Sequence, residues 1–148
     1  MLNNNRNIII GTSYYGISNR FRNPIGITHY FPSGTSLPEE RKLQWLAPPF
    51  EIVKKFSEGS LPREALKEIY LEILLDENFR LKMAMQDIIE KFGKTPVFLG
   101  CSKDPLHCYR SIFAEAVTEV TGYEVREVTS QHELHNINIE KIIAKYNQ

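Results

Sequence analysis

Several features that would assign a protein to a class at once are absent from this sequence. It has no excess of charge, because Lys plus Arg and Asp plus Glu each total 18. This balance argues against a protein that coats a polyanion over its whole surface, although it allows a local basic patch. No apolar run approaches the roughly 20 residues that cross a bilayer, and the opening MLNNNRNIII lacks the apolar segment of a signal peptide. We therefore expect a cytoplasmic protein without a membrane partner.

Cysteine is also scarce, since the chain has only Cys101 and Cys108. Cytoplasmic thiols are usually reduced, so we interpret both residues as free thiols or metal ligands in preference to a disulfide. Together with His132 and His135 they would supply four metal ligands, but their spacing matches no tight zinc pattern. We expect neither a metal nor a cofactor.

What the sequence does contain is a regular succession of strand and helix patterns. Its 148 residues, 42% hydrophobic and 24% charged, are typical of one globular domain. Strands are predicted at about residues 6–10, ending at Gly11, and at 25–31, 96–99 and 123–128. Helices are predicted to begin at about Pro49, Pro62, Asp76, Asp104 and Asn136.

Strands separated by helices indicate an α/β fold, here one small domain with a mainly parallel sheet of three to four strands flanked by helices. We expect the first and third strands to be central parallel neighbours, because both are apolar throughout and both end in glycine. Ligands of such sheets lie beyond the carboxyl ends of the strands. Two of these ends are rich in polar groups and are predicted to open onto one crevice.

The first of these ends is GTSYYG, which follows the first strand. Hydroxyl groups and free amides at such a turn are suited to phosphate, and tyrosines are suited to stacking on a base or sugar. Thr12, Ser13, Tyr14 and Tyr15 are therefore candidate ligand-binding residues. The alternative is an ordinary turn with one tyrosine packed inward.

The second end is GCSKDPLHCYR, after the third strand. Asp104 as a cap and Pro105 in the first turn would begin a helix with Cys108 in its first turn, where free amides favour a thiolate. Cys108 is then the candidate nucleophile, and Arg110 the clamp for an anion. The alternative is that Cys108 is a small buried apolar residue.

Three neighbours of this cysteine complete the candidate site. Lys103 is a further candidate for binding the anion. His107 or Tyr109 is the candidate proton carrier.

The stretch VFLGCSKDPLHCYRS resembles the signature of the family called domain of unknown function 488. That signature is an apolar strand, then Cys-x-Glu-Lys-Asp-Pro, then Cys-His-Arg opening a helix. GTSYYG, IGITHYFP and WLAPPFEIV are similar to further segments of the family, so the resemblance covers residues 8 to about 128. It implies an architecture and a site, but no reaction, since the activity of the family is not established.

The sequence is identical to the family signature at only some of its positions. The identical positions are Lys103, Asp104, Pro105, Cys108 and Arg110. Gly100, Ser102 and Tyr109 stand where the family has cysteine, glutamate and histidine. A chain that has lost an acid or base of the family is a candidate for a binding role or an altered reaction.

The sequence thus leaves three hypotheses. The first is a cleft for an anionic ligand, nucleotide-like or derived from nucleic acid, in a protein that is an enzyme if Cys108 is a nucleophile. The second is a non-catalytic module that binds such a ligand. The third is a nucleic-acid-binding protein that uses the aromatic residues and the loop with Arg20 and Arg22, with Arg41 in the same basic rim. The neutral net charge argues mildly against this third hypothesis.

Overall fold

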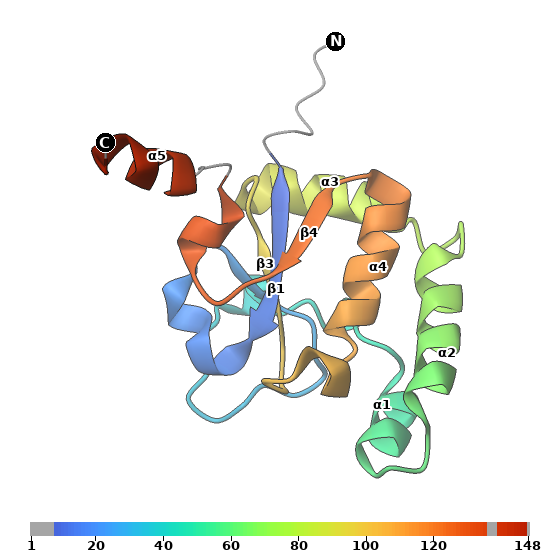
Figure 1. Ribbon diagram of the computed structural model, residues 1–148. Coiled ribbons are helices and arrows are strands. Elements are labelled where there is room, and N and C mark those ends of the chain that lie inside the picture. The colour runs from blue at the N-terminus through green and yellow to red at the C-terminus, as the bar shows by residue number, and fades with distance from the viewer. Residues whose placement is uncertain (1–7, 136–138, 148) are drawn as a thin grey trace.

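The computed structural model describes residues 8–135 and 139–147, and these form an α/β fold (Figure 1). The described residues contain one four-stranded sheet in which all paired strands are parallel. Its strands are β1 (Ile9–Tyr14), β2 (Pro24–Gly26), β3 (Val97–Gly100) and β4 (Glu124–Glu127), in the order β2-β3-β1-β4. The prediction that the first and third strands are central parallel neighbours is confirmed.

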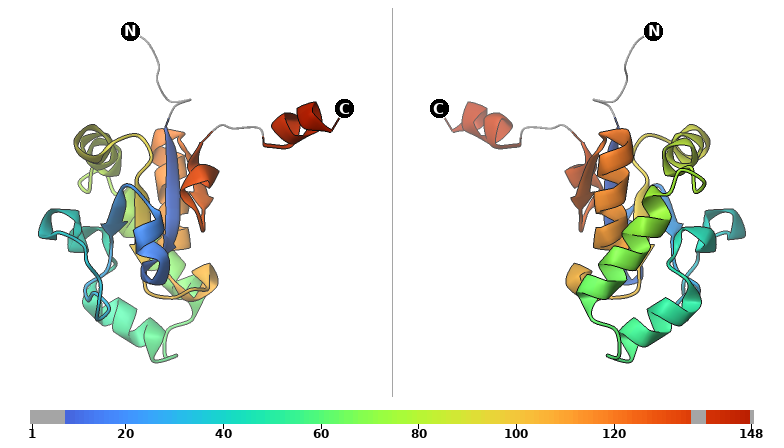
Figure 2. Two further views of the ribbon diagram at one scale, coloured as in Figure 1. Left: turned by 90° about the vertical axis from the view of Figure 1, so that its left-hand side faces the viewer. Right: turned by 90° about the vertical axis from the view of Figure 1, so that its right-hand side faces the viewer.

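Helices cover one face of this sheet and shorter segments cover the other (Figures 1 and 2). The helices are α1 (Phe50–Ser57), α2 (Arg63–Leu75), α3 (Leu81–Phe92), α4 (Arg110–Thr121) and α5 (Ile139–Tyr146). Side chains of adjacent β1 residues point to opposite faces, so Ile10 packs with α2, α3 and α4 while Ile9 packs with Leu134 in a second cluster. Two 3₁₀ segments, at Tyr15–Arg20 and Gln131–Leu134, close this second face.

The strand β1 does not end at Gly11 as predicted, but continues to Tyr14. The glycine is there for packing rather than for a turn. A Cβ at Gly11 would lie 2.9 Å from Leu134 Cδ2 and 3.0 Å from Val128 Cγ2. Thr12, Ser13 and Tyr14 therefore belong to the central strand, and no turn is formed at GTSYYG until Tyr15.

Two other boundaries differ from the prediction. The strand β2 is three residues long, where 25–31 were expected, because the chain turns away from β3 after the amide of Ile27 bonds to the Leu99 carbonyl at 3.2 Å. The helix α3 begins at Leu81 rather than at Asp76, because Arg80 adopts a left-handed conformation (φ 57°) that separates it from α2.

The C-terminal helix α5 lies apart from the rest of the fold (Figure 1). Its predicted start near Asn136 falls outside the described residues. Among the helices of the described ranges, none is both long enough and apolar enough to span a bilayer.

Candidate functional site

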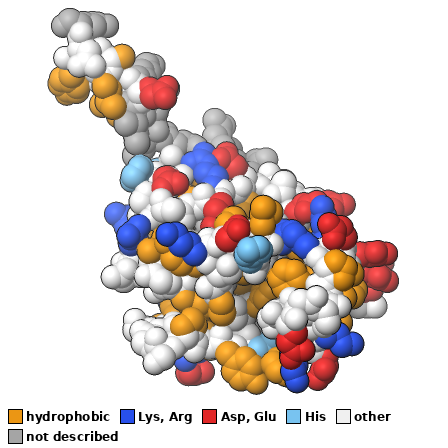
Figure 3. Space-filling view, turned by 60° about the horizontal axis from the view of Figure 1, so that its bottom comes forward, with side chains coloured by type: hydrophobic (Ala, Val, Ile, Leu, Met, Phe, Trp, Pro, Cys, Tyr) orange, Lys and Arg blue, Asp and Glu red, His pale blue; other side chains and the backbone are white. Residues whose placement is uncertain are grey.

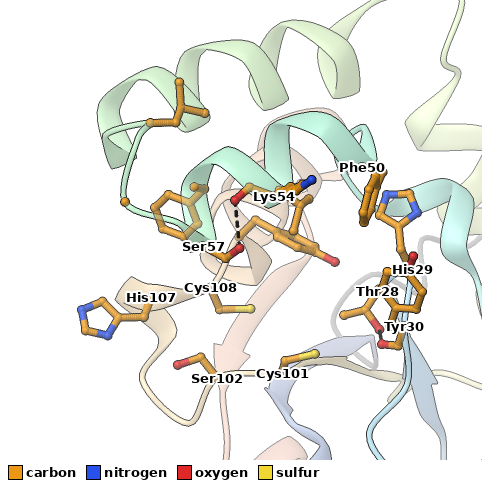
Figure 4. A pocket seen from close by; sticks show the side chains of 15 residues that line it. Thr28, His29, Tyr30, Phe50, Lys54, Ser57, Cys101, Ser102, His107 and Cys108 are labelled. Carbon is orange, nitrogen blue, oxygen red and sulfur yellow. Dashed lines mark hydrogen bonds between the residues drawn. The ribbon is translucent and has the colours of Figure 1, made fainter.

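A cavity of about 780 Å³ lies beyond the carboxyl ends of β2 and β3, and α1 forms its outer wall (Figure 4). This volume is in the range of small-molecule sites. Figure 3 shows this end of the molecule, where hydrophobic side chains gather between charged ones. The residues that line the cavity are Thr28, His29, Tyr30, Phe50, Val53, Lys54, Phe56, Ser57, Gly59, Leu61, Cys101, Ser102, His107, Cys108 and Tyr109.

Aromatic rings form one part of the wall. The rings of Tyr30 and Phe50 meet edge to face with centroids 5.7 Å apart, and those of His29 and Phe50 with centroids 6.0 Å apart. Phe50, Lys54 and Ser57 are spaced by four and three residues, which places them on one face of α1. The helix thereby presents a ring, an ammonium group and a hydroxyl group to the same cavity.

The charge of the lining is one-sided. Lys54 contributes a cation, and His29 and His107 contribute imidazoles. Of the described residues that line the cavity, none carries a carboxylate. A ligand with a negatively charged group therefore finds an attractive charge and no carboxylate among these lining residues.

Both thiols of the chain line one part of this cavity, and their sulfur atoms lie on its wall in Figure 4. Cys108 is 4% exposed, and its sulfur packs on Gly100, where any Cβ would overlap it. The residue after that glycine is Cys101, which is exposed. Partial burial of the Cys101 thiol raises its pKa, and the neighbouring Cys108 adds to this effect. Interactions with Thr28 and with the charge of Arg110 lower the pKa in part.

Cys108 does not lie in the first turn of a helix, so that prediction is wrong. Asp104 does act as a cap, accepting from the Leu106 amide at 2.9 Å, but it caps only the short 3₁₀ turn Pro105–His107. Cys108 follows in an extended conformation (φ −136°, ψ 149°), and α4 begins at Arg110. The charge nearest to the sulfur is instead a side chain, the guanidinium of Arg110.

Arg110 does not point into the cavity as the expected anion clamp. Its side chain is 0% exposed and makes a two-pronged ion pair with Glu127, with Nε 3.0 Å from Oε1 and Nη2 2.8 Å from Oε2. The remaining donors reach the carbonyl oxygens of Ser102 and Lys103. The guanidinium fork is thus already filled by protein acceptors, and it holds the loop that carries both cysteines.

A second arginine holds the same loop from α2. Arg63 donates through Nη1 to the carbonyl oxygens of Leu106 (2.9 Å) and Cys108 (3.1 Å), and through Nη2 to Ser111 Oγ (2.5 Å). The backbone between the cysteines is therefore fixed from both ends, by α2 and by α4. Such fixation is what a reacting group needs in order to keep one position.

The residues predicted at the end of the first strand do not line the cavity. Thr12 donates to Glu127 Oε1 at 2.7 Å, and Ser13 donates to the Val128 carbonyl at 2.7 Å. The Tyr15 hydroxyl bonds to Thr28 Oγ1 at 2.7 Å, and Tyr14 packs against the second cluster. The expectation that both strand ends open onto one crevice is wrong, because the 3₁₀ segment Tyr15–Arg20 closes the end of β1 at once.

The three predicted catalytic residues do line the cavity, but they are not equivalent. The Tyr109 hydroxyl donates to the Ile27 carbonyl at 2.6 Å, and burial raises the pKa of Tyr109 far above the usual tyrosine value, so it is unsuited to carry a proton. The His107 side chain is 77% exposed, 3.8 Å from Asp104 Oδ2, and Figure 4 shows its ring turned away from the thiols. Lys103 is exposed and is not part of the lining.

Several lining residues were missed in the sequence. His29 and Tyr30 follow the short strand β2, and polar or aromatic residues at the carboxyl end of a parallel strand are a signal that would have indicated them. Lys54 and Ser57 gave no such signal, because a lysine and a serine on a surface helix are ordinary. Cys101 was not among the predicted site residues, although its thiol lines the same cavity as that of Cys108.

Within the described ranges, no three His, Cys, Asp or Glu side chains are placed to share a metal ion. In comparisons with known proteins, no family model, curated protein or solved structure matches the chain.

Proposed function

We propose that the cavity binds a small anionic ligand, nucleotide-like or derived from nucleic acid, and that the protein is an enzyme with Cys108 as its nucleophile. The observation that carries this proposal is the composition of the lining. A lysine, two histidines and two thiols line the cavity together with aromatic side chains, and none of the described lining residues carries a carboxylate. A lysine and two thiols in the lining of one cavity of this volume are typical of a ligand site rather than of a packing defect.

The geometry suggests how such a ligand lies. A planar ring fits against Tyr30 and Phe50, and a phosphate or carboxylate fits beside Lys54. His29 Nε2 lies 2.6 Å from the Pro48 carbonyl oxygen, which only accepts, so Nε2 carries the hydrogen. In the neutral ring, Nδ1 is then the free acceptor, and His29 becomes the candidate to carry a proton in place of Tyr109.

The reaction follows from the position of the sulfur. The Arg110 guanidinium lies beside the Cys108 sulfur, because both groups pack against Gly100, and a neighbouring cation is a common setting for a nucleophilic thiol. The Cys108 sulfur forms a bond to an electrophilic carbon or phosphorus of the ligand as the bond to the leaving group breaks. Water then releases the bound fragment and restores the thiol. The loop carbonyls bound by Arg63 and Arg110 keep the sulfur in place during both steps.

A binding module without catalysis is the alternative, and one observation favours it. The Tyr109 hydroxyl, at the position where the 488-type signature has histidine, is already bound to the backbone of Ile27. Ser102 stands where that signature has glutamate. A protein that only holds its ligand needs neither group.

Membership of the 488-type family is part of this proposal. Cys108, Tyr109 and Ser102, which lie within its signature, also line the cavity, and this supports a site at the same place. The third hypothesis, a nucleic-acid surface, has less support. Arg20 donates to the Thr129 carbonyl at 3.2 Å, and Arg41 stacks on Phe92, so two of the three arginines have partners within the chain.

Calorimetric titration of the purified protein with nucleoside monophosphates, and with the matching nucleosides, tests the binding proposal. We expect the monophosphates to bind more tightly, and Lys54→Gln to weaken their binding about tenfold, as the loss of one charge-assisted contact predicts. Lys55→Gln is the matched control, because Lys55 is the next residue of the same helix and is also exposed, but it lies outside the lining.

Equal affinity for nucleosides and monophosphates would contradict the anionic site, and so would an equal effect of the two lysine substitutions. Identification of small molecules released from the protein on denaturation gives an independent check on the ligand class. Turnover that Cys108→Ser abolishes while binding persists separates the enzyme from the binding module.

A further inference from the structure

We infer that Cys101 and Cys108 form a redox pair, a modification site at which a hydroperoxide converts the two thiols into an intramolecular disulfide. The inference rests on the proposed role of Cys108 as a nucleophile and adds a second residue and an oxidant class to the same site. In the sequence the two residues are separated by a loop of six. In the structure both of their side chains lie on the lining of one cavity.

The packing around Gly100 places the Cys108 thiol at the end of the strand from which Cys101 follows. The Cys108 sulfur rests on Gly100, in the place that a Cβ of that residue would take. Cys101 follows Gly100 directly, at the point where β3 ends and the loop begins. Figure 4 shows both sulfur atoms on the same part of the cavity wall, with Ser102 beside them. A residue with a side chain at position 100 would stand between Cys108 and the strand.

The surroundings of the two thiols give them different roles. Cys108 has the Arg110 guanidinium beside its sulfur, because Arg110 Nη1 and the sulfur both pack against Gly100, and a neighbouring cation is a common setting for an attacking thiol. Cys101 is exposed, its pKa is raised chiefly by burial, and the charge of Arg110 is the smallest of the effects on it. Cys108 is therefore the thiol that attacks, and Cys101 is the thiol that resolves.

The chemistry balances in two steps. The Cys108 thiolate attacks one oxygen of the hydroperoxide, the O–O bond breaks, and an alcohol or water leaves as Cys108 becomes a sulfenic acid. The Cys101 thiol then attacks the Cys108 sulfur, the S–O bond breaks, and the hydroxyl group leaves as water with the thiol proton. Two electrons have passed from the two thiols to the peroxide. The disulfide removes the nucleophile until a dithiol reduces it.

Hydrogen peroxide treatment of the fully reduced protein, followed by intact mass measurement and peptide mapping, tests this pair. We expect the wild-type chain to lose two hydrogens and both free thiols, and to regain them with dithiothreitol. Cys101→Ser should form no disulfide and should instead accumulate a Cys108 sulfenic acid that dimedone traps. Cys108→Ser should show much slower oxidation of Cys101 and no disulfide within the chain.

Any of three results would overturn the inference. The first is a dimedone adduct on wild-type Cys108 without loss of the two hydrogens, and the second is a disulfide formed only between two chains. The third is oxidation of Cys101 at the same rate in the presence and absence of Cys108. Alkylation of the reduced protein by iodoacetamide separates the two proposals. Labelling of Cys108 without disulfide formation refutes the pair alone, whereas no labelling of the native Cys108 refutes its role as a nucleophile as well.

Discussion

The contact between Gly100 and Cys108 shows how a residue without a side chain positions a reactive one. The Cys108 sulfur occupies the volume of a Cβ at position 100, and Arg110 Nη1 lies 3.4 Å from the same point. Any larger residue must displace the sulfur, the guanidinium or the strand. The function of this glycine is thus steric, since its backbone is that of an ordinary strand residue.

Gly100→Ala is therefore expected to lower the free energy of unfolding by about 1–3 kcal/mol, as overpacking of a buried site does, and to change the alkylation rate of Cys108. Urea denaturation and thiol labelling measure the two effects. Gly16→Ala serves as the control, because its Cβ would contact only the ring of Tyr14. A stable Gly100→Ala variant with unchanged labelling would show that the sulfur does not rest on this residue.

The buried pair of Arg110 and Glu127 is the second decisive feature at this scale. Arg110→Lys keeps the charge but loses the planar fork that binds Glu127, Ser102 and Lys103 at once. We expect it to lower the free energy of unfolding by about 2–4 kcal/mol, with monophosphate affinity unchanged in the folded protein. Thermal unfolding and calorimetry measure the two quantities. Weaker binding with unchanged stability would instead restore Arg110 as an anion clamp.

At the scale of the elements, the loop between β3 and α4 is held in place by hydrogen bonds from two neighbouring helices. Arg63 reaches it from α2 and Arg110 from α4. The Pro105 carbonyl also accepts from Ser111 Oγ at 3.1 Å. The position of the cysteines thus depends on helices that do not themselves line the cavity.

Arg63→Met is expected to raise the rate of amide hydrogen exchange in residues 102–109 while leaving the exchange of β1 and β3 unchanged. The substitution removes three hydrogen bonds to the loop and its helix but keeps the apolar stem of the side chain. Lys67→Met on the same helix is the control, because Lys67 pairs only with the exposed Glu115 at 3.3 Å. Equal exchange in both variants would show that the loop is held by other contacts.

The sequence was sufficient to predict the central strands and the helices, but not the residues at which they begin and end. Apolar patterns at Ile9 and Ile10 and at Val97 to Leu99 predicted the central strands, because burial on both faces leaves few other solutions. The end of β1 was misplaced because a glycine needed for packing against Leu134 has the same appearance as a glycine in a turn. The start of α4 was misplaced because Asp104 and Pro105 begin a 3₁₀ turn with the same residues that begin an α-helix.

At the scale of the whole molecule, the order of the strands decides where a ligand can bind. The end of β1 is closed by the 3₁₀ segment after it, so the open carboxyl ends are those of β2 and β3, under α1. The sequence indicated the thiol-bearing loop after β3, but it did not indicate that His29 and Lys54 would face it. That arrangement depends on the packing of α1, which leaves no pattern in the residues themselves.

The central claim is that an anionic ligand meets a nucleophilic Cys108 in this cavity, and two alkylating reagents test both halves of it together. Iodoacetate is anionic, and iodoacetamide is its neutral counterpart. In the Cys101→Ser variant, the alkylation rate of Cys108 by iodoacetate is divided by the rate by iodoacetamide. This ratio for the folded protein, divided by the same ratio for the unfolded chain, measures the preference of the site for an anion. We expect this quotient to exceed one severalfold, to fall towards one in Lys54→Gln, and to stay high in Lys55→Gln. A quotient of one in the parent protein, or a native Cys108 that neither reagent labels, would contradict the account.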